Sequence, residues 1–234
     1  MLKKISLTIL LVSLLVLLGV WSPWNKLDIS FLEVFGLKQS IDYAGLQVYS
    51  LSGEVQVEID GELAGNVTVE GSPLEIIEIE PGEHLVSLSR VGEDTTNDPI
   101  YHRLNRVIRF EEGVNTVIAY ELGPSKEFSE GYIITTTQAM DPGNPKLNLT
   151  TNPDDAQITI NDLDIGVSPL SNYAIDTTQN YQIEIKKENY ETIVFDLLPQ
   201  DEIQRDLLKE YDINVEVNLF QIPIEVIEVN EQQE

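Results

Sequence analysis

The sequence predicts a mainly β protein made of two tandem, small, antiparallel β-sandwich-like domains, with one N-terminal transmembrane helix and one short helix near the C-terminus. Apolar and polar residues alternate in many short segments, as in VQVEI at 55–59, and this period of two is typical of half-buried strands. The order of these segments recurs in the two halves of the chain. A length of 234 residues suffices for two domains of about 100 residues each.

Composition narrows the classes of function. The formal net charge is −26 and the pI is near 4.2, so no nucleic-acid partner is expected, because lysine and arginine are needed to neutralise phosphates. With 42% hydrophobic residues the chain can still bury a core. It contains no cysteine and two histidines, which excludes disulfides and thiolate sites and leaves little material for zinc.

Residues 1–24 have the pattern of an export signal. Two lysines precede an apolar run from Ile5 to Trp21, and Trp24 follows. As a helix this run would span roughly 25 Å, enough for a membrane if the tryptophans lie in the interface. The small residues of a cleavage site are missing, although a cleaved signal peptide is the alternative. We expect a single-pass signal anchor containing Ile5, Trp21 and Trp24, with the later domains outside the cytoplasm.

The rest of the chain divides at breaks in the strand pattern. Residues 25–44 are predicted to be a juxtamembrane stalk, 45–137 and 147–230 the two β-domains, 138–146 a linker with two prolines and a glycine, and 231–234 a tail. A helix is predicted at 199–211, where apolar residues share one face. Strands are predicted at 46–51, 75–80, 84–90, 105–110, 114–122, 132–137, 191–197, 213–220 and 223–229, with further alternating segments around 55–59, 147–149, 158–160 and 181–185.

The two halves can be aligned as an internal repeat. Residues 45–65 correspond to 146–166, the triplet SPL occurs at 72–74 and 168–170, and 77–90 correspond to 173–187. A slip of one residue would turn every core side chain outward. The alignment that keeps the inward face therefore matches Val86 with Ile183 and Leu88 with Ile185.

The repeated blocks resemble the PEGA domain, a small β-sandwich-like module. The second copy has PDDA at 153–156, an alternating strand, then Gly166 and Ser-Pro; the first has Asp-Gly at 60–61 and PGEH at 81–84. Asp155 and Asp162 stand where the pattern has glycine, and both tolerate left-handed turn geometry. The residues that carry the resemblance are Asp60, Gly61, Gly65, Pro73, Pro81, Gly82, Pro153, Ala156, Gly166 and Pro169.

Four aspartates crowd the strongest match, at Asp154, Asp155, Asp162 and Asp164. Calcium takes six to eight oxygen ligands and is the metal that such a cluster would suit, but the spacing is not that of an EF-hand loop. We interpret these carboxylates as turn residues that bond their own backbone, with calcium as the alternative. No other cofactor is expected.

No catalytic residue is predicted. Sequence spacing identifies no glycosidase-like carboxylate pair. Ser72 is not in a nucleophile elbow, and neither His84 nor His102 has an evident partner. An envelope hydrolase is therefore the least favoured hypothesis.

A basic stretch at 101–109 stands out in this acidic chain, within a segment, 91–109, that is an insertion relative to the second copy. It contains His102, Arg103, Arg106 and Arg109. Internal pairing with neighbouring acidic strands is the favoured interpretation. Docking of an acidic polymer or a partner is the alternative.

These observations predict a non-catalytic protein, anchored in the membrane and displaying two PEGA-like domains on its outer side. The resemblance implies binding or scaffolding at the cell envelope, through contacts with proteins, cell-wall polysaccharide or a surface layer. A carbohydrate- or calcium-dependent binding module is the alternative.

Overall fold

A computed structural model describes residues 43–91 and 101–223, which belong to one compact unit. These residues form fifteen strands and one α-helix, α3 (Glu202–Leu207), which continues into a 3-10 turn at Leu208–Glu210. The strands are β1 (Ala44–Ser50), β2 (Glu54–Ile59), β3 (Glu62–Thr68), β4 (Leu74–Ile79), β5 (Gly82–Arg90), β6 (Leu104–Phe110), β7 (Asn115–Glu121), β8 (Glu130–Gln138), β9 (Lys146–Asn152), β10 (Gln157–Ile160), β11 (Leu163–Val167), β12 (Leu170–Ala174), β13 (Gln182–Lys186), β14 (Ile193–Asp196) and β15 (Tyr211–Asn218).

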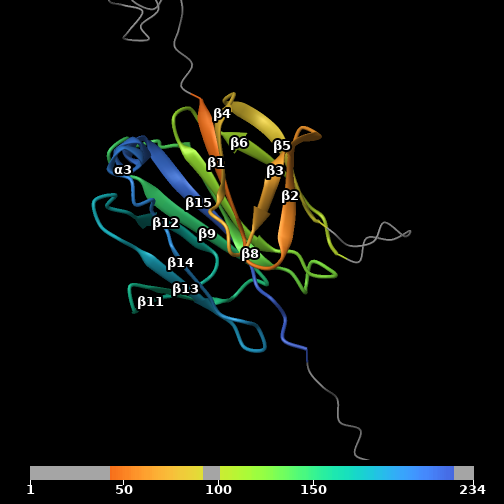
Figure 1. Cartoon of the computed structure of the whole chain (residues 1–234). Helices are drawn as coiled ribbons and strands as arrows, with labels where there is room; N and C mark the ends of the chain where they lie inside the picture. The colour runs from red at the N-terminus through yellow and green to blue at the C-terminus, as the bar shows by residue number, and fades with distance from the viewer. Residues whose placement is uncertain (1–42, 92–100, 224–234) are drawn as a thin grey trace, which may run out of the picture. The chain divides into compact units, whose positions relative to one another are not determined.

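The strands form three sheets, of which the largest is shared by both halves of the chain. This central sheet has seven strands in the order β12-β9-β15-β8-β7-β1-β4. Two four-stranded sheets have the orders β3-β2-β5-β6 and β11-β10-β13-β14. Figure 1 shows the long strands of the central sheet side by side, with the first small sheet on one side of them and the second on the other.

The first half, residues 44–121, and the second half, residues 146–218, have the same strand pairing. In each half the first and last strands pair in parallel, and the first strand also pairs antiparallel with the fourth. The register repeats as well. Val57 pairs with Leu88 in the first half, as Ile158 pairs with Ile185 in the second. These are the matches that the inward-face alignment predicts.

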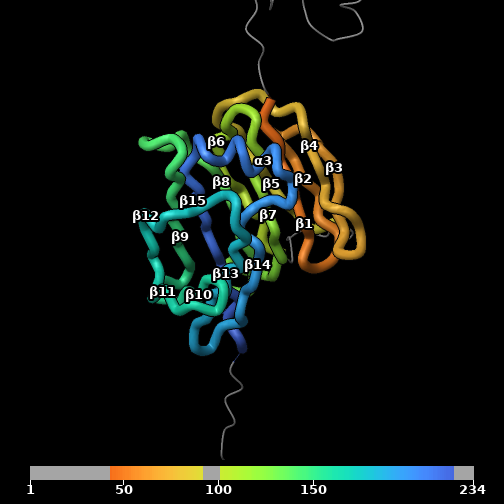
Figure 2. The backbone as a smooth tube through the Cα atoms, turned by 90° about the vertical axis from the view of Figure 1, so that its left-hand side faces the viewer, coloured from red at the N-terminus to blue at the C-terminus, as the bar shows by residue number. Residues whose placement is uncertain are grey.

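Strand β8 lies between the two halves and belongs to neither repeat. It pairs antiparallel with β7 on one edge and with β15 on the other. Outward from β8, both directions show the order last strand, first strand, fourth strand. The halves are thus related by a pseudo-two-fold rotation about an axis along β8, which places their small sheets on opposite faces of the central sheet. Figure 2 shows β9 and β12 of the second half on one side of β8 and β1 and β4 of the first half on the other.

Alternate side chains of β8 enter two separate cores. Ile133 packs in the core of the first half, together with Leu46, Leu88 and Phe110. Ile134 packs in the core of the second half, with Ile158 among its neighbours. Because successive strand residues point to opposite faces, one strand closes both cores.

The turn between the second and third strands of each half has the same construction. Asp60 and Asn161 both have positive φ, at 52° and 49°, a conformation that Asp and Asn tolerate better than most residues. Their side-chain oxygens accept hydrogen bonds from the backbone N–H of Leu85 (2.9 Å) and Gln182 (2.8 Å). The side chain therefore holds the turn against the neighbouring strand in both halves.

Several expectations need correction. The sheets are not wholly antiparallel, because β1–β7 and β9–β15 are parallel pairs. The expected linker at 138–146 is a turn between two strands of the same sheet rather than a connection between separate sandwiches. Strands β3, β11 and β12 were not predicted; they lie at sheet edges and have largely exposed side chains without alternation. The predicted helix at 199–211 is present but shorter, and Asp201 caps it by accepting from the Gln204 N–H.

Some predicted segments lie outside the described residues. They are the anchor at 1–24 with Ile5, Trp21 and Trp24, nearly all of the stalk, residues 92–100 of the insertion, and all but the start of the strand at 223–229. Within the part of the chain that the structure describes, no helix is long and apolar enough to cross a membrane.

The shared strand predicts cooperative unfolding of both halves. Ile133→Ala and Ile134→Ala should each lower the free energy of unfolding by about 2–5 kcal/mol, because each opens a cavity in a packed core. In urea unfolding followed by circular dichroism and tyrosine fluorescence, both variants should shift one common transition. Gln138→Ala, an exposed change on the same strand, is the control and should leave the midpoint nearly unchanged. Two separate transitions, each moved by one variant only, would contradict a single cooperative unit.

Candidate functional site

The residues that carry the PEGA resemblance lie mostly in turns and strand irregularities. Gly65 and Gly166 occupy equivalent places, opposite Val57 and Ile158, where the register of the hairpin shifts in each half. Gly166 has φ of 123°, a conformation strongly disfavoured for residues with a Cβ atom. The others are Asp60 and Gly61 in the turn after β2, Pro73 before β4, Pro81 and Gly82 at the start of β5, Pro153 and buried Ala156 between β9 and β10, and Pro169 before β12.

The four aspartates of the second half do not form one cluster of ligands. Asp155 and Asp162 have positive φ in two different turns, and Asp164 accepts from the Gly166 N–H at 3.0 Å. The structure brings Asp155 and Asp164 to one shallow hollow of the surface, but Lys186 and Lys187 line it too. Among the described residues, no group of three or more potential metal ligands is close enough to hold an ion.

The Lys187 ammonium lies in this aspartate region. Its Nζ donates to the backbone oxygens of Asp154 (2.6 Å) and Asp155 (3.3 Å). The turn is thus tied to the residue that follows β13 by a side chain that carries a positive charge.

The arginines of the basic stretch pair with acidic residues, as the favoured interpretation predicts. Arg103 pairs with Glu58, Arg106 with Glu216 at 2.6 Å, and Arg109 with Glu111 at 2.9 Å. The Arg106 pair is the informative one, since it joins β6 of the first half to β15 of the second across 110 residues of sequence. It forms one wall of a groove between the halves.

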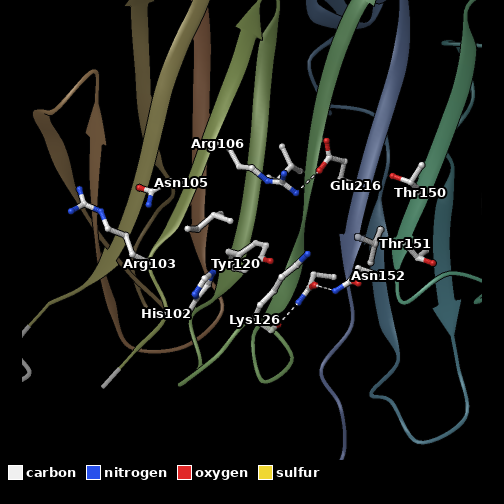
Figure 3. Close-up of a pocket in the computed structure, with 14 residues that line it drawn as sticks. His102, Arg103, Asn105, Arg106, Tyr120, Lys126, Thr150, Thr151, Asn152 and Glu216 are labelled. Carbon is white, nitrogen blue, oxygen red and sulfur yellow. Dashed lines mark hydrogen bonds and ion pairs between the residues drawn. The ribbon is translucent and has the colours of Figure 1, made fainter. Parts of the chain in front are cut away.

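This groove, called the basic groove below, has a volume of about 340 Å³. Strands β9 and β15 form its floor and the start of β6 its wall. The floor belongs to the face of the central sheet opposite the second core. Its polar lining includes His102, Arg106, Tyr120, Lys126, Thr150, Asn152, Glu216 and Asn218 (Figure 3). The guanidinium of Arg103, also at the rim, points away from it.

Asparagines in register organise the floor of the sheet around the basic groove. The parallel pairing of β9 with β15 sets Asn148 beside Asn214 and Asn152 beside Asn218. Each pair is joined by an amide hydrogen bond, of 3.1 Å and 2.5 Å respectively. Asn218 also donates to the Lys126 backbone oxygen at 2.9 Å. The amides are therefore held in fixed orientations by one another, which makes the surface rigid.

Tyr120 is a buried residue of the basic groove whose side chain carries a polar group. The residue is 5% exposed, and burial raises the pKa of its phenol to about 12, against a smaller opposing effect of Arg106. Its hydroxyl has no hydrogen-bond partner among the described residues. Every fully buried side-chain polar atom of these residues does have a partner, so the Tyr120 hydroxyl is not fully buried. The neutral hydroxyl is thus open to the groove, into which it points (Figure 3).

The pseudo-two-fold places a second groove on the opposite face, over the first half's share of the central sheet. This second groove, called the wide groove below, has a volume of about 820 Å³ and lies between β1, β7 and β8 and the segment from β14 to α3. Its lining is mixed: apolar residues such as Tyr49, Val117 and Leu198 lie beside the acidic residues Glu75, Asp196 and Asp201. It has the same place in the fold as the basic groove but a different character.

Sequence reasoning missed the partner of His84. Its Nδ1 lies 2.6 Å from Asp60 Oδ2, and its Nε2 lies 2.9 Å from the Glu80 backbone oxygen. The hydrogen bond to Asp60 raises the pKa of His84 and lowers that of Asp60. The alignment of the halves contained a signal for this pair. It matches Asp60 with Asn161 and His84 with Tyr181, so both members of the pair occupy corresponding places in the two halves.

Comparison with known proteins supports the resemblance for part of the chain. The model of the PEGA domain family matches residues 144–204, from just before β9 into α3. No curated protein matches the chain. Residues 144–204 are therefore similar to the PEGA domain family.

The Asp60–His84 pair predicts a pH-dependent contribution to stability from the first half. His84 has its pKa raised above 6.5, so its contribution is complete below that value and is lost as pH rises through the raised pKa. Asp60 has its pKa lowered below 3.8, so its contribution is lost only as pH falls through the lowered pKa. The pair should stabilise the fold most between pH 3.8 and 6.5.

Asp60→Asn tests this pair, because asparagine, the natural residue at 161, keeps the turn and its acceptor oxygen. We expect the variant to be less stable than the parent in urea unfolding at pH 6 and nearly equal at pH 9. Asn161→Asp, with Tyr181 in place of a histidine, is the matched control and should show no such change over this range. An equal loss at both pH values for Asp60→Asn would contradict the prediction.

Proposed function

We propose that the chain is a membrane-anchored protein with two PEGA-like units outside the cytoplasm, which binds components of the cell envelope and holds them without catalysis. The observation that carries the proposal is the pair of grooves on opposite faces of the central sheet. In each, one half supplies the floor and the other half a wall. A fold of this kind presents two ligand surfaces on one rigid support.

Three features support the first half as a second PEGA-like unit. It repeats the strand pairing of the half that contains the matched domain. It repeats the register shift opposite Gly65 and Gly166. It also repeats the side-chain-capped turn at Asp60 and Asn161.

Binding is favoured over catalysis by how the polar side chains of the basic groove are used. Arg106 and Glu216 neutralise each other, and Asn152 and Asn218 of the floor bond to each other. Such mutual pairing fixes the shape of a surface, whereas a general acid or base must exchange its proton with a substrate.

A carbohydrate-binding module is the second candidate, favoured by the hydroxyl and amide groups that line the basic groove. Calcium dependence is disfavoured by the lysines beside Asp155 and Asp164.

Membrane anchoring is tested by cell fractionation. The full chain should sediment with membranes, and protease added to the outer side of the membrane should remove residues 43–223. A variant lacking residues 1–24 but carrying a cleavable signal peptide is the control and should be recovered in the soluble exported fraction. Recovery of the full chain in the soluble fraction would contradict the anchor.

Envelope binding is tested by affinity capture. The tagged full chain, in mild detergent, is incubated with an envelope extract from its own source cells, and bound proteins and sugars are identified by mass spectrometry. We expect a defined protein or glycan component to be enriched over the same chain after thermal unfolding. Equal capture by the folded and unfolded chain would overturn the proposed function.

A further inference from the structure

We propose that the basic groove binds a carboxylated sugar residue, of the uronic acid type, within an acidic glycan. This inference rests on the proposed function and names the ligand class of one of its two grooves. It is carried by the groove's charge, its open hydroxyl and amide groups, and its size.

The charge of the groove calls for one negative group. Arg106 is paired with Glu216, whereas no acidic residue of the described chain lies within ion-pair distance of the Lys126 ammonium. Figure 3 shows this ammonium extending into the groove, on the same side as the Tyr120 hydroxyl. Arg106 and Lys126 against Glu216 leave one net positive charge, which a single carboxylate would balance.

The remaining lining suits a ligand rich in hydroxyl groups. Tyr120 has an unpartnered hydroxyl on a residue that is 95% removed from solvent, which can donate and accept. Thr150 and Asn152 add a hydroxyl and an amide on the facing strand. The Thr150 hydroxyl donates to the Val215 backbone oxygen at 3.5 Å and the Asn152 Nδ2 donates to Asn218 Oδ1, so both side chains keep an oxygen as an acceptor. The groove therefore offers both a donor and acceptors near the single charge.

Sheet pairing disfavours a peptide on the floor of the groove. Peptides often bind a sheet by adding a strand to an exposed edge. The floor strands β9 and β15 and their neighbour β8 are interior strands, each paired on both sides, so recognition at the floor must come from side chains. The wall strand β6 is the edge of its sheet, and the peptide probe below tests whether a strand is added there.

The size of the groove limits the ligand to one or two sugar rings at a time. Its 340 Å³ lies near the lower end of the roughly 300–1,000 Å³ typical of small-molecule sites. The groove opens at the surface between the halves, so a longer chain could continue beyond it on both sides.

The test uses the folded full chain in detergent and isothermal titration calorimetry with matched probes. Cellobiouronic acid, a disaccharide with one carboxylate, is compared with neutral cellobiose and with the peptide N-acetyl-Ser-Asp-Gly amide. We expect the acidic disaccharide to bind at least about tenfold more tightly than cellobiose, since a hydrogen bond to a charged group outweighs a neutral one. The peptide should bind no better than cellobiose.

Variants locate the binding in the basic groove. Lys126→Met should weaken binding of the acidic disaccharide by at least about tenfold, and Tyr120→Phe by about two- to tenfold. Lys146→Met, which removes one positive charge from β9 outside the basic groove, and Tyr49→Phe, in the wide groove, are the matched controls and should change binding less than twofold.

Each contrary result has a definite meaning. Absence of binding by a folded chain, equal binding of the neutral disaccharide, equal binding of the peptide, or unchanged binding by both groove variants would overturn the uronic acid assignment. Envelope capture can persist in each of these cases, so the proposed function would stand. If the folded chain captures no more than the unfolded chain, the proposed function fails whatever the disaccharides do.

Discussion

The structure depends on the two-sided use of β8. A strand has only two faces, and here each face supplies side chains to a different core, with Ile133 on one side and Ile134 on the other. This requirement fixes the register of β8 twice, because a slip of one residue would exchange the side chains offered to the two cores. The paired halves and the position of both grooves follow from that register.

Duplication of a unit usually produces domains joined by a linker, with an interface more polar than a core. In this chain β8 joins the strands of the two halves into one continuous sheet. Each half therefore contributes strands to the central sheet that a small sheet covers on one face only. The edge of the other half then forms a wall beside the uncovered face. The same geometry gives a polar, net positive groove at Thr150 and Asn152 and a groove of mixed lining, with acidic residues beside Val117 and Leu198, on the other face.

Much of the β structure was predictable because period-two alternation reports burial on one face. It identified most strands and the equivalence of Val86 with Ile183, while it missed β3 and β11, whose faces are both largely exposed. The shared sheet was harder to predict, since parallel pairs such as β1–β7 join residues about seventy positions apart. The adjacent isoleucines of β8 were the one local signal, as a strand buried on both faces loses its alternation.

The candidate site was predictable only in its most conspicuous part. The run of arginines drew attention to residues 101–109, and their internal pairing was anticipated from the surrounding acidic strands. The groups that give the basic groove its character, Tyr120, Lys126 and Asn152, come from separate strands and loops. Nothing in their local sequence distinguishes them from ordinary strand and turn residues, because their proximity is created by the pseudo-two-fold packing.

The direction of the strands also determines how the molecule would carry a mechanical load. Strands β1 and β15 run parallel, since β7 is parallel to β1 and both β7 and β15 are antiparallel to β8. Ala44 at the start of β1 and Asn218 at the end of β15 consequently lie at opposite ends of the central sheet (Figure 1). A pull between these ends acts along the strands and across their hydrogen bonds, so many bonds resist together and shearing, rather than unzipping one bond at a time, is required to open the sheet.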